Sequence, residues 1–173
     1  SARIIADLAG EADVDVSASP ALLEIRTATT RFATGLIDGR PVDYNKLIPE
    51  QKPIVVFRPY VLAEAVTRAS VVYLGEADTN KRTSQIHITV GPKGIELGAG
   101  NRGSEQANET VEVESATGYL AVTLFEPYLS ACLASWPETA SVGMTQLGTG
   151  QPVLFMAADQ PNVQHVIMPQ KPI

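Results

Sequence analysis

Two seven-residue segments of this sequence repeat each other: Phe57–Ala63 reads FRPYVLA and Phe125–Ala131 reads FEPYLSA. Each segment opens an alanine-rich apolar stretch and carries its proline where a helix has its first turn, a position at which the missing N–H costs nothing. A third helical pattern, at residues 2–9, stands one similar period upstream. Self-similarity on this scale indicates stacked copies of one supersecondary unit, because a single copy cannot bury its own apolar face.

The periodicity of apolar residues predicts helices at about residues 2–10, 59–70 and 127–135, each followed by short alternating segments. The alternating segments predict strands around Val14 and Val16, Leu23 and Ile25, Phe32 to Ile37, Ile86 to Val90, Ile95 and Leu97, Val111 and Val113, Val142 and Met144, Val153 and Phe155, and Val166 and Met168. Three units of one helix plus antiparallel strands make an α+β protein.

The composition is that of a compact protein with a sizeable core, since 45% of the 173 residues are hydrophobic and only 18% are charged. No apolar run approaches the roughly 18 residues of a membrane helix, and the first residues do not have the basic-then-apolar pattern of a signal peptide. The one cysteine, Cys132, lies among apolar residues of the third helix, so we expect it to pack there. A cytoplasmic location is the prediction.

The motifs that could carry catalysis or hold a cofactor are weak. Residues 98–103 match G-x-G-x-x-G, but an alternating strand pattern follows them where a dinucleotide site needs a helix. His87 and His165 each lie on an expected strand, without cysteine or carboxylate at metal-ligand spacing. We therefore expect no catalytic residues, no metal and no cofactor. An enzyme is the least favoured class of function.

Two segments resemble the bacterial sliding clamp, the beta subunit of DNA polymerase III. Leu36–Pro49 reads LIDGRPVDYNKLIP, and that family has L-[IV]-D-G-R-F-P-D-Y-x-x-[VL]-[IL]-P between its second and third domains. His165–Pro169 reads HVIMP near the end of the chain, where the family has V-[VI]-M-P. Two departures are that Pro41 and Val42 replace Phe-Pro, and that Gln170–Ile173 replaces the usual ending.

The resemblance implies a DNA-clamp fold with three of the six helix-plus-strands units that each clamp protomer has. Residues 1–56 would be the second half of the middle domain, and residues 57–173 the C-terminal domain. The polar segment Glu50–Pro53 is the expected link between them. We also expect a homo-oligomer, because clamp protomers form rings and because a lone N-terminal unit would expose Ile4, Ile5 and Leu8.

In function, the resemblance implies a non-catalytic processivity factor that tethers the replicative polymerase to duplex DNA. The helices of the family line the central hole, where DNA is held by sequence-independent phosphate contacts, so a net charge of −6 is no objection. The residues expected to face DNA are Arg3, Arg68, Lys81 and Arg82. The alternative for each of them is an ordinary solvated surface charge.

Clamps bind short peptide motifs of polymerases and clamp-loader subunits in a hydrophobic pocket. By resemblance the wall of this pocket would comprise Val42, Lys46, Leu47, Phe125, Tyr128, Val166, Ile167, Met168 and Pro169. These residues suit a peptide with leucine or phenylalanine anchors, whereas the competing interpretation places Tyr128 and Val166 in an ordinary core. A second function stays open: a shortened stand-alone clamp homologue that binds peptides without encircling DNA.

Overall fold

The chain forms two compact units, Ser1–Val42 and Asp43–Ile173. The structure is a computed structural model that describes residues 13–37, 39, 43, 48, 52–73, 84–100, 106–146 and 148–171. The helix expected at residues 2–10 lies outside the described residues. The domain boundary expected after residue 56 stays a prediction; in the structure this position lies within strand β4 (Val55–Phe57), which pairs with a strand of the second unit.

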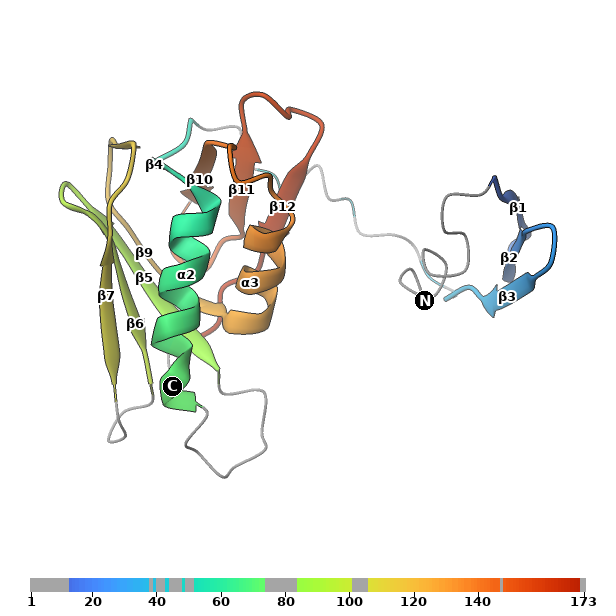
Figure 1. The fold of residues 1–173 in the computed structure, drawn as a ribbon, viewed down its shortest axis with the longest axis horizontal. Helices are drawn as coiled ribbons and strands as arrows, with labels where there is room; N and C mark the ends of the chain where they lie inside the picture. Colours follow the sequence, from blue (N-terminus) through green and yellow to red (C-terminus); the bar gives the residue numbers. More distant parts are fainter. Residues whose placement is uncertain are drawn as a thin grey trace. The chain divides into compact units, whose positions relative to one another are not determined.

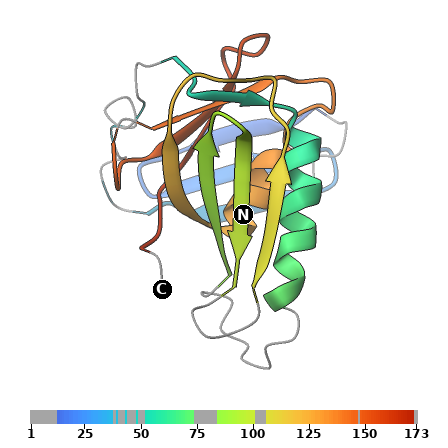
Figure 2. The ribbon, with the colours of Figure 1, turned by 90° about the vertical axis from the view of Figure 1, so that its left-hand side faces the viewer.

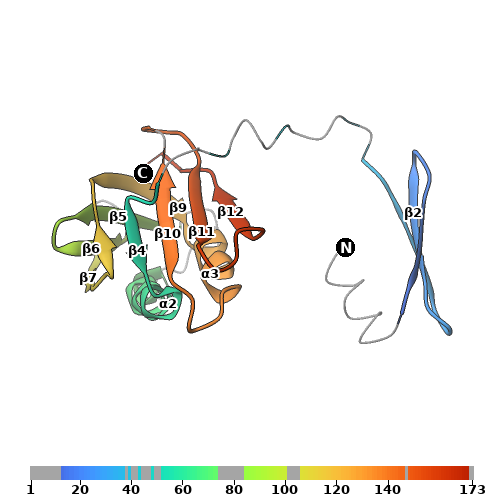
Figure 3. The same ribbon diagram turned by 90° about the horizontal axis from the view of Figure 1, so that it is seen from above.

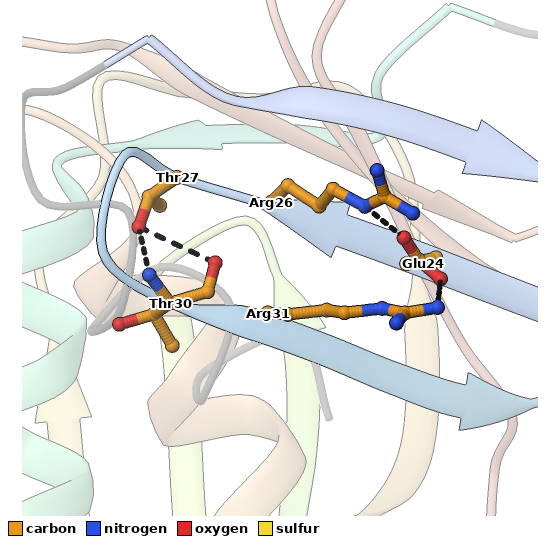
Figure 4. Close-up of polar contacts among 5 residues, drawn as sticks. All are labelled: Glu24, Arg26, Thr27, Thr30 and Arg31. Atoms are coloured by element: carbon orange, nitrogen blue, oxygen red, sulfur yellow. Dashed lines mark hydrogen bonds and ion pairs between the residues drawn. The ribbon is translucent and has the colours of Figure 1, made fainter.

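The first unit contains a three-stranded antiparallel sheet in the order β1-β2-β3. Its strands are β1 (Asp15–Ala18), β2 (Leu22–Arg26) and β3 (Arg31–Gly35). The turn between β2 and β3 is closed by Thr27, whose hydroxyl oxygen accepts a hydrogen bond of 3.0 Å from the Thr30 N–H (Figure 4). Threonine is frequent in such turns because its side chain replaces a backbone partner.

A buried carboxylate stabilises the same hairpin. Arg26 and Arg31 lie directly opposite each other across β2 and β3, an arrangement that is unfavourable for two like charges. Glu24 lies between them and accepts a hydrogen bond from each guanidinium (Figure 4). These two hydrogen bonds hold the pKa of the Glu24 carboxyl below its ordinary value, and the bond from Arg31 has the larger effect. The two attractive contacts with Glu24 thus offset the repulsion between Arg26 and Arg31.

The second unit has two antiparallel sheets. The five-stranded sheet has the order β12-β11-β10-β4-β8, of which Figure 3 labels the first four strands, and the four-stranded sheet has the order β7-β6-β5-β9. The strands of the first are β12 (Gln164–Ile167), β11 (Val153–Ala157), β10 (Val142–Gln146), β4 and β8 (Ser115–Ala116). Those of the second are β7 (Ala107–Val111), β6 (Gly94–Ala99), β5 (Gln85–Gly91) and β9 (Leu120–Phe125).

Two helices pack side by side against these sheets (Figure 1). They are α2 (Pro59–Ala69), which continues into the 3₁₀ turn η2 (Ser70–Tyr73), and α3 (Glu126–Ala134). Each helix has proline in its first turn, as the repeated segments predicted. Each also follows a strand almost directly, β4 before α2 and β9 before α3. The repeat is therefore a strand–helix junction that occurs twice, and the α+β class is confirmed.

The core of the second unit lies between the helices and the two sheets. Leu62 and Val66 of α2 and Leu129 and Leu133 of α3 are buried there, one helical turn apart on each helix. They meet fully buried strand residues from both sheets: Phe57, Ile86, Ile88, Ile95, Leu124, Met144 and Phe155. One continuous core thus joins both sheets and fixes the position of α3 relative to β12.

Candidate functional site

A hollow of about 460 Å³ lies beside helix α3 and strand β12. Its lining is Tyr128, Ala131, Cys132, His165, Val166, Ile167 and Met168. The three residues from α3 lie on one face of the helix, because positions three and four apart are neighbours on a helix surface. The other four are consecutive: His165–Ile167 end β12, and Met168 follows it. The hollow is therefore built by one helix face and one strand of the same unit.

The lining has an exposed rim and a buried floor. Tyr128 is 64% exposed and Met168 is 57% exposed, which is unusual for large apolar side chains. Ile167, which also lines the hollow, is only 6% exposed. Clustered exposed apolar side chains mark surfaces that bind other molecules. The competing interpretation, in which Tyr128 and Val166 are core residues, is wrong, since Val166 is also 37% exposed.

The ring of Tyr128 is held in place by Phe125. The two ring centroids are 5.1 Å apart and the planes meet at 86°, an edge-to-face contact that aromatic pairs favour. Phe125 is itself fixed, because it is the last residue of β9, pairs with Gln85 of β5 and is the N-cap residue of α3. The sheet therefore positions the rim of the hollow through one aromatic contact.

Cys132 contributes apolar surface to the floor of the hollow. Burial raises the pKa of its thiol to about 11. A thiol with so high a pKa is not ionised near neutral pH and is a poor nucleophile. The packing role expected for this cysteine agrees with its burial.

His165 adds an imidazole ring to the lining. Its Nε2 lies 2.9 Å from the Ser135 hydroxyl, and its ring meets the buried Trp136 edge-on with centroids 5.2 Å apart. These contacts hold the imidazole against the C-terminal end of α3. The sequence patterns did not assign His165, Ala131 or Cys132 to the site. The signal for the last two was present, since they follow Tyr128 by three and four residues on the same helix.

Of the nine residues that the resemblance assigned to a peptide pocket, the structure brings four together in the hollow: Tyr128, Val166, Ile167 and Met168. Phe125 contacts the ring of Tyr128 but is not part of the lining. Pro169 lines a separate hollow of about 490 Å³, where the tail runs beside β9 and the Gln170 N–H donates to the Thr123 carbonyl. Three of the nine lie outside the described residues: Val42, Lys46 and Leu47.

Arg68 is the expected DNA-facing residue that the structure describes, whereas Arg3, Lys81 and Arg82 lie outside the described residues. Its Nε and Nη2 donate to Oε1 and Oε2 of Glu109 at 3.1 and 3.0 Å. A third contact joins its Nη1 to Glu64 Oε2 at 3.9 Å. The hydrogen bond with Arg68 lowers the pKa of Glu109, and the one with Glu109 raises the pKa of Arg68. Arg68 is thus already paired in this structure.

Other kinds of site find no support within the described part of the chain. No group of three or more histidine, cysteine, aspartate or glutamate side chains could hold a metal ion there. None of the described helices is long and apolar enough to cross a membrane. The glycine motif begins within β6, at Gly98, and the next described element after it is the strand β7, as the alternating pattern predicted.

Known proteins of one family resemble the chain in sequence and fold. A beta sliding clamp of Haemophilus influenzae is 25% identical over 150 residues, which are 86% of this chain and 39% of that relative. The solved sliding clamp of Caulobacter crescentus superimposes with a TM-score of 0.79 at 24% identity, covering 98% of this chain and 44% of the other. The sliding clamp of Pseudomonas aeruginosa gives 0.78 at 24% identity, covering 96% and 44%.

These likenesses show the sliding-clamp fold, and the chain spans less than half the length of the relatives it matches. The family itself is shown by a sequence model of the C-terminal domain of the DNA polymerase III beta subunit, which matches residues 45–171. That match covers almost the whole second unit, including α3, β12 and the hollow between them. The chain therefore belongs to the DNA polymerase III beta subunit family and carries the C-terminal domain of that family.

Proposed function

We propose that this chain is the C-terminal region of a sliding clamp, a non-catalytic factor that tethers a replicative polymerase to DNA and binds partner proteins in the hollow beside α3 and β12. The observation that carries the proposal is the pair of exposed anchors, Tyr128 and Met168, above the buried floor at Ile167. An apolar hollow of this kind fits leucine or phenylalanine side chains of a short peptide. Polymerase and clamp-loader subunits are the partners expected to supply such peptides.

The peptide-binding part of the proposal has a direct test. A fluorescein-labelled peptide with leucine and phenylalanine anchors is expected to bind with a Kd of tens of micromolar, or about −6 kcal/mol. The double substitution Tyr128→Ala and Met168→Ala removes both rim anchors and is expected to weaken binding by roughly tenfold or more. Fluorescence anisotropy titrations of the two proteins measure the difference.

A matched control removes the same kind of surface elsewhere. Tyr119 is 71% exposed and Val16 is 60% exposed, and neither lines the hollow. The double variant Tyr119→Ala and Val16→Ala is expected to bind the peptide as the unchanged chain does. Equal affinity for the unchanged chain and for the Tyr128→Ala, Met168→Ala variant would remove the hollow as the binding site.

A stand-alone peptide-binding module is the second candidate function. The observation that favours it is that every described residue of the hollow comes from the second unit, on α3 and at the end of β12. Peptide binding at this site therefore needs no closed ring. The two functions differ in what they predict for DNA, since only the clamp requires that the protein hold duplex DNA.

For DNA, this chain by itself is expected to bind linear duplex weakly and without sequence preference. Each phosphate contact makes binding more sensitive to salt, by about one log unit of affinity per log unit of salt concentration. With few contacts, binding should be detectable at low salt and lost near physiological salt. A gel-shift titration across salt concentrations measures it. Tight, salt-resistant binding would contradict this expectation, and peptide binding without any DNA binding would favour the stand-alone module.

A further inference from the structure

Helices α2 and α3 carry a surface groove whose charge does not suit DNA. The groove has a volume of about 520 Å³ and is lined by both helices, with Glu64, Arg68 and Glu138 as its charged residues. Within these two described helices, Arg68 is the sole basic residue. The sliding-clamp proposal places this helical face toward duplex DNA. Whether the face can bind a phosphate therefore depends on which groups the Arg68 guanidinium already contacts.

The guanidinium of Arg68 is occupied by a carboxylate from another element. Glu109 belongs to β7, which runs beside α2 (Figure 2). Its two oxygens accept from Nε and Nη2 at 3.1 and 3.0 Å, so the pair is bidentate. Glu64, one turn before Arg68 on α2, lies 3.9 Å from the remaining nitrogen. Two carboxylates thus surround one cation, and the local charge is negative.

We propose that Glu109 acts as a built-in competitor of DNA, occupying the face of Arg68 that would otherwise bind a backbone phosphate. The proposal rests on the sliding-clamp function proposed above and adds a regulating residue to it. Carboxylate and phosphate both match the two-donor fork of arginine, so one excludes the other from the same edge of the guanidinium. A phosphate can occupy the Nε–Nη2 edge of Arg68 only after Glu109 leaves it, and the helical face therefore holds DNA weakly.

Removal of the competitor should tighten DNA binding. The variant Glu109→Gln loses the charge, keeps the size of the side chain and frees Arg68. Affinity for a labelled duplex of mixed sequence is expected to rise roughly three- to fivefold at low salt, and the salt dependence should steepen by about one phosphate contact. Fluorescence anisotropy at several salt concentrations yields both quantities.

The control separates a freed Arg68 from a general loss of negative charge. Glu138→Gln removes one charge from the same groove, but Glu138 lies on the loop after α3 and not on β7. It is expected to change affinity less than about twofold and to leave the salt slope unchanged. In an Arg68→Ala background, Glu109→Gln is expected to have no more effect than Glu138→Gln.

Three results would overturn the proposal: equal effects of Glu109→Gln and Glu138→Gln, an effect of Glu109→Gln that survives Arg68→Ala, or no DNA binding by any variant. The third would also count against the DNA part of the proposed function, whereas the first two leave it intact because the unchanged chain still binds DNA. Glu109→Ala is the second variant if the glutamine variant does not fold, and the same rise in affinity is expected for it.

Discussion

Replacement of Phe155 by alanine is expected to lower the free energy of unfolding of the second unit by about 3–5 kcal/mol. Phe155 is fully buried in β11, opposite Met144 of β10 on one side and His165 of β12 on the other. Truncation removes a large apolar side chain and leaves a cavity that close-packed neighbours cannot fill. Because His165 lines the hollow, the same change should also weaken peptide binding.

Urea unfolding followed by tryptophan fluorescence measures this loss. The chain has one tryptophan, Trp136, which is buried in the second unit, so the signal reports that unit alone. Phe155→Leu keeps most of the volume and is expected to cost about 1 kcal/mol. A loss below about 1 kcal/mol for Phe155→Ala would mean that the core around β11 is less tightly packed than the structure shows.

Gly94→Ala is the second substitution with a large expected effect, a loss of roughly 3 kcal/mol in the free energy of unfolding. Gly94 begins β6 after the β5–β6 turn with φ of 122°, a conformation that residues with a side chain rarely adopt. A Cβ there would also lie 2.5 Å from the carbonyl oxygen of Val111 on the adjacent β7. The conformational strain and the steric clash would thus come from the same added methyl group, and the atom nearest to it belongs to the backbone.

Two other glycines separate these effects in the same unfolding experiment. Gly150 has φ of 77° with open space around its Cβ position, so Gly150→Ala reports conformational strain alone, about 1 kcal/mol. At Gly143 a Cβ would lie 2.5 Å from Cγ of Pro53, without a positive φ, so Gly143→Ala reports crowding alone. If Gly94→Ala is no less stable than Gly150→Ala, then β7 moves aside without lowering the free energy of unfolding.

The helices of the second unit could be predicted closely from the sequence because proline marks their starts. The predicted spans 59–70 and 127–135 correspond to Pro59–Ala69 and Glu126–Ala134. No strand was expected at β4, β8 or β9. β4 and β9 enter the following helix without turn residues, so no break in the sequence separates their apolar residues from those of the helix. β8 has only two residues, too few for any periodicity.

The site could be predicted only in part, because a sequence motif identifies some of its residues whereas the fold brings in the others. Val166, Ile167 and Met168 were identified by a family motif near the end of the chain, and Tyr128 by the resemblance to the same family. Ala131 and Cys132 belong to no motif and enter the hollow through helix geometry. The pairing of Arg68 with Glu109 joins residues far apart in sequence, so it required the packing of β7 beside α2.

At the rim of the hollow, β9 continues directly into α3, with no linker residue between the strand and the helix. Phe125 belongs to both elements at once, as the last paired residue of the strand and the N-cap of the helix. One residue inserted there would turn every later helix position by about 100° around its axis. Tyr128 would then swing off the rim, while the register of the sheet stayed unchanged. Length variation in such proteins should therefore be found at the hairpin around Gly150 and not at this junction.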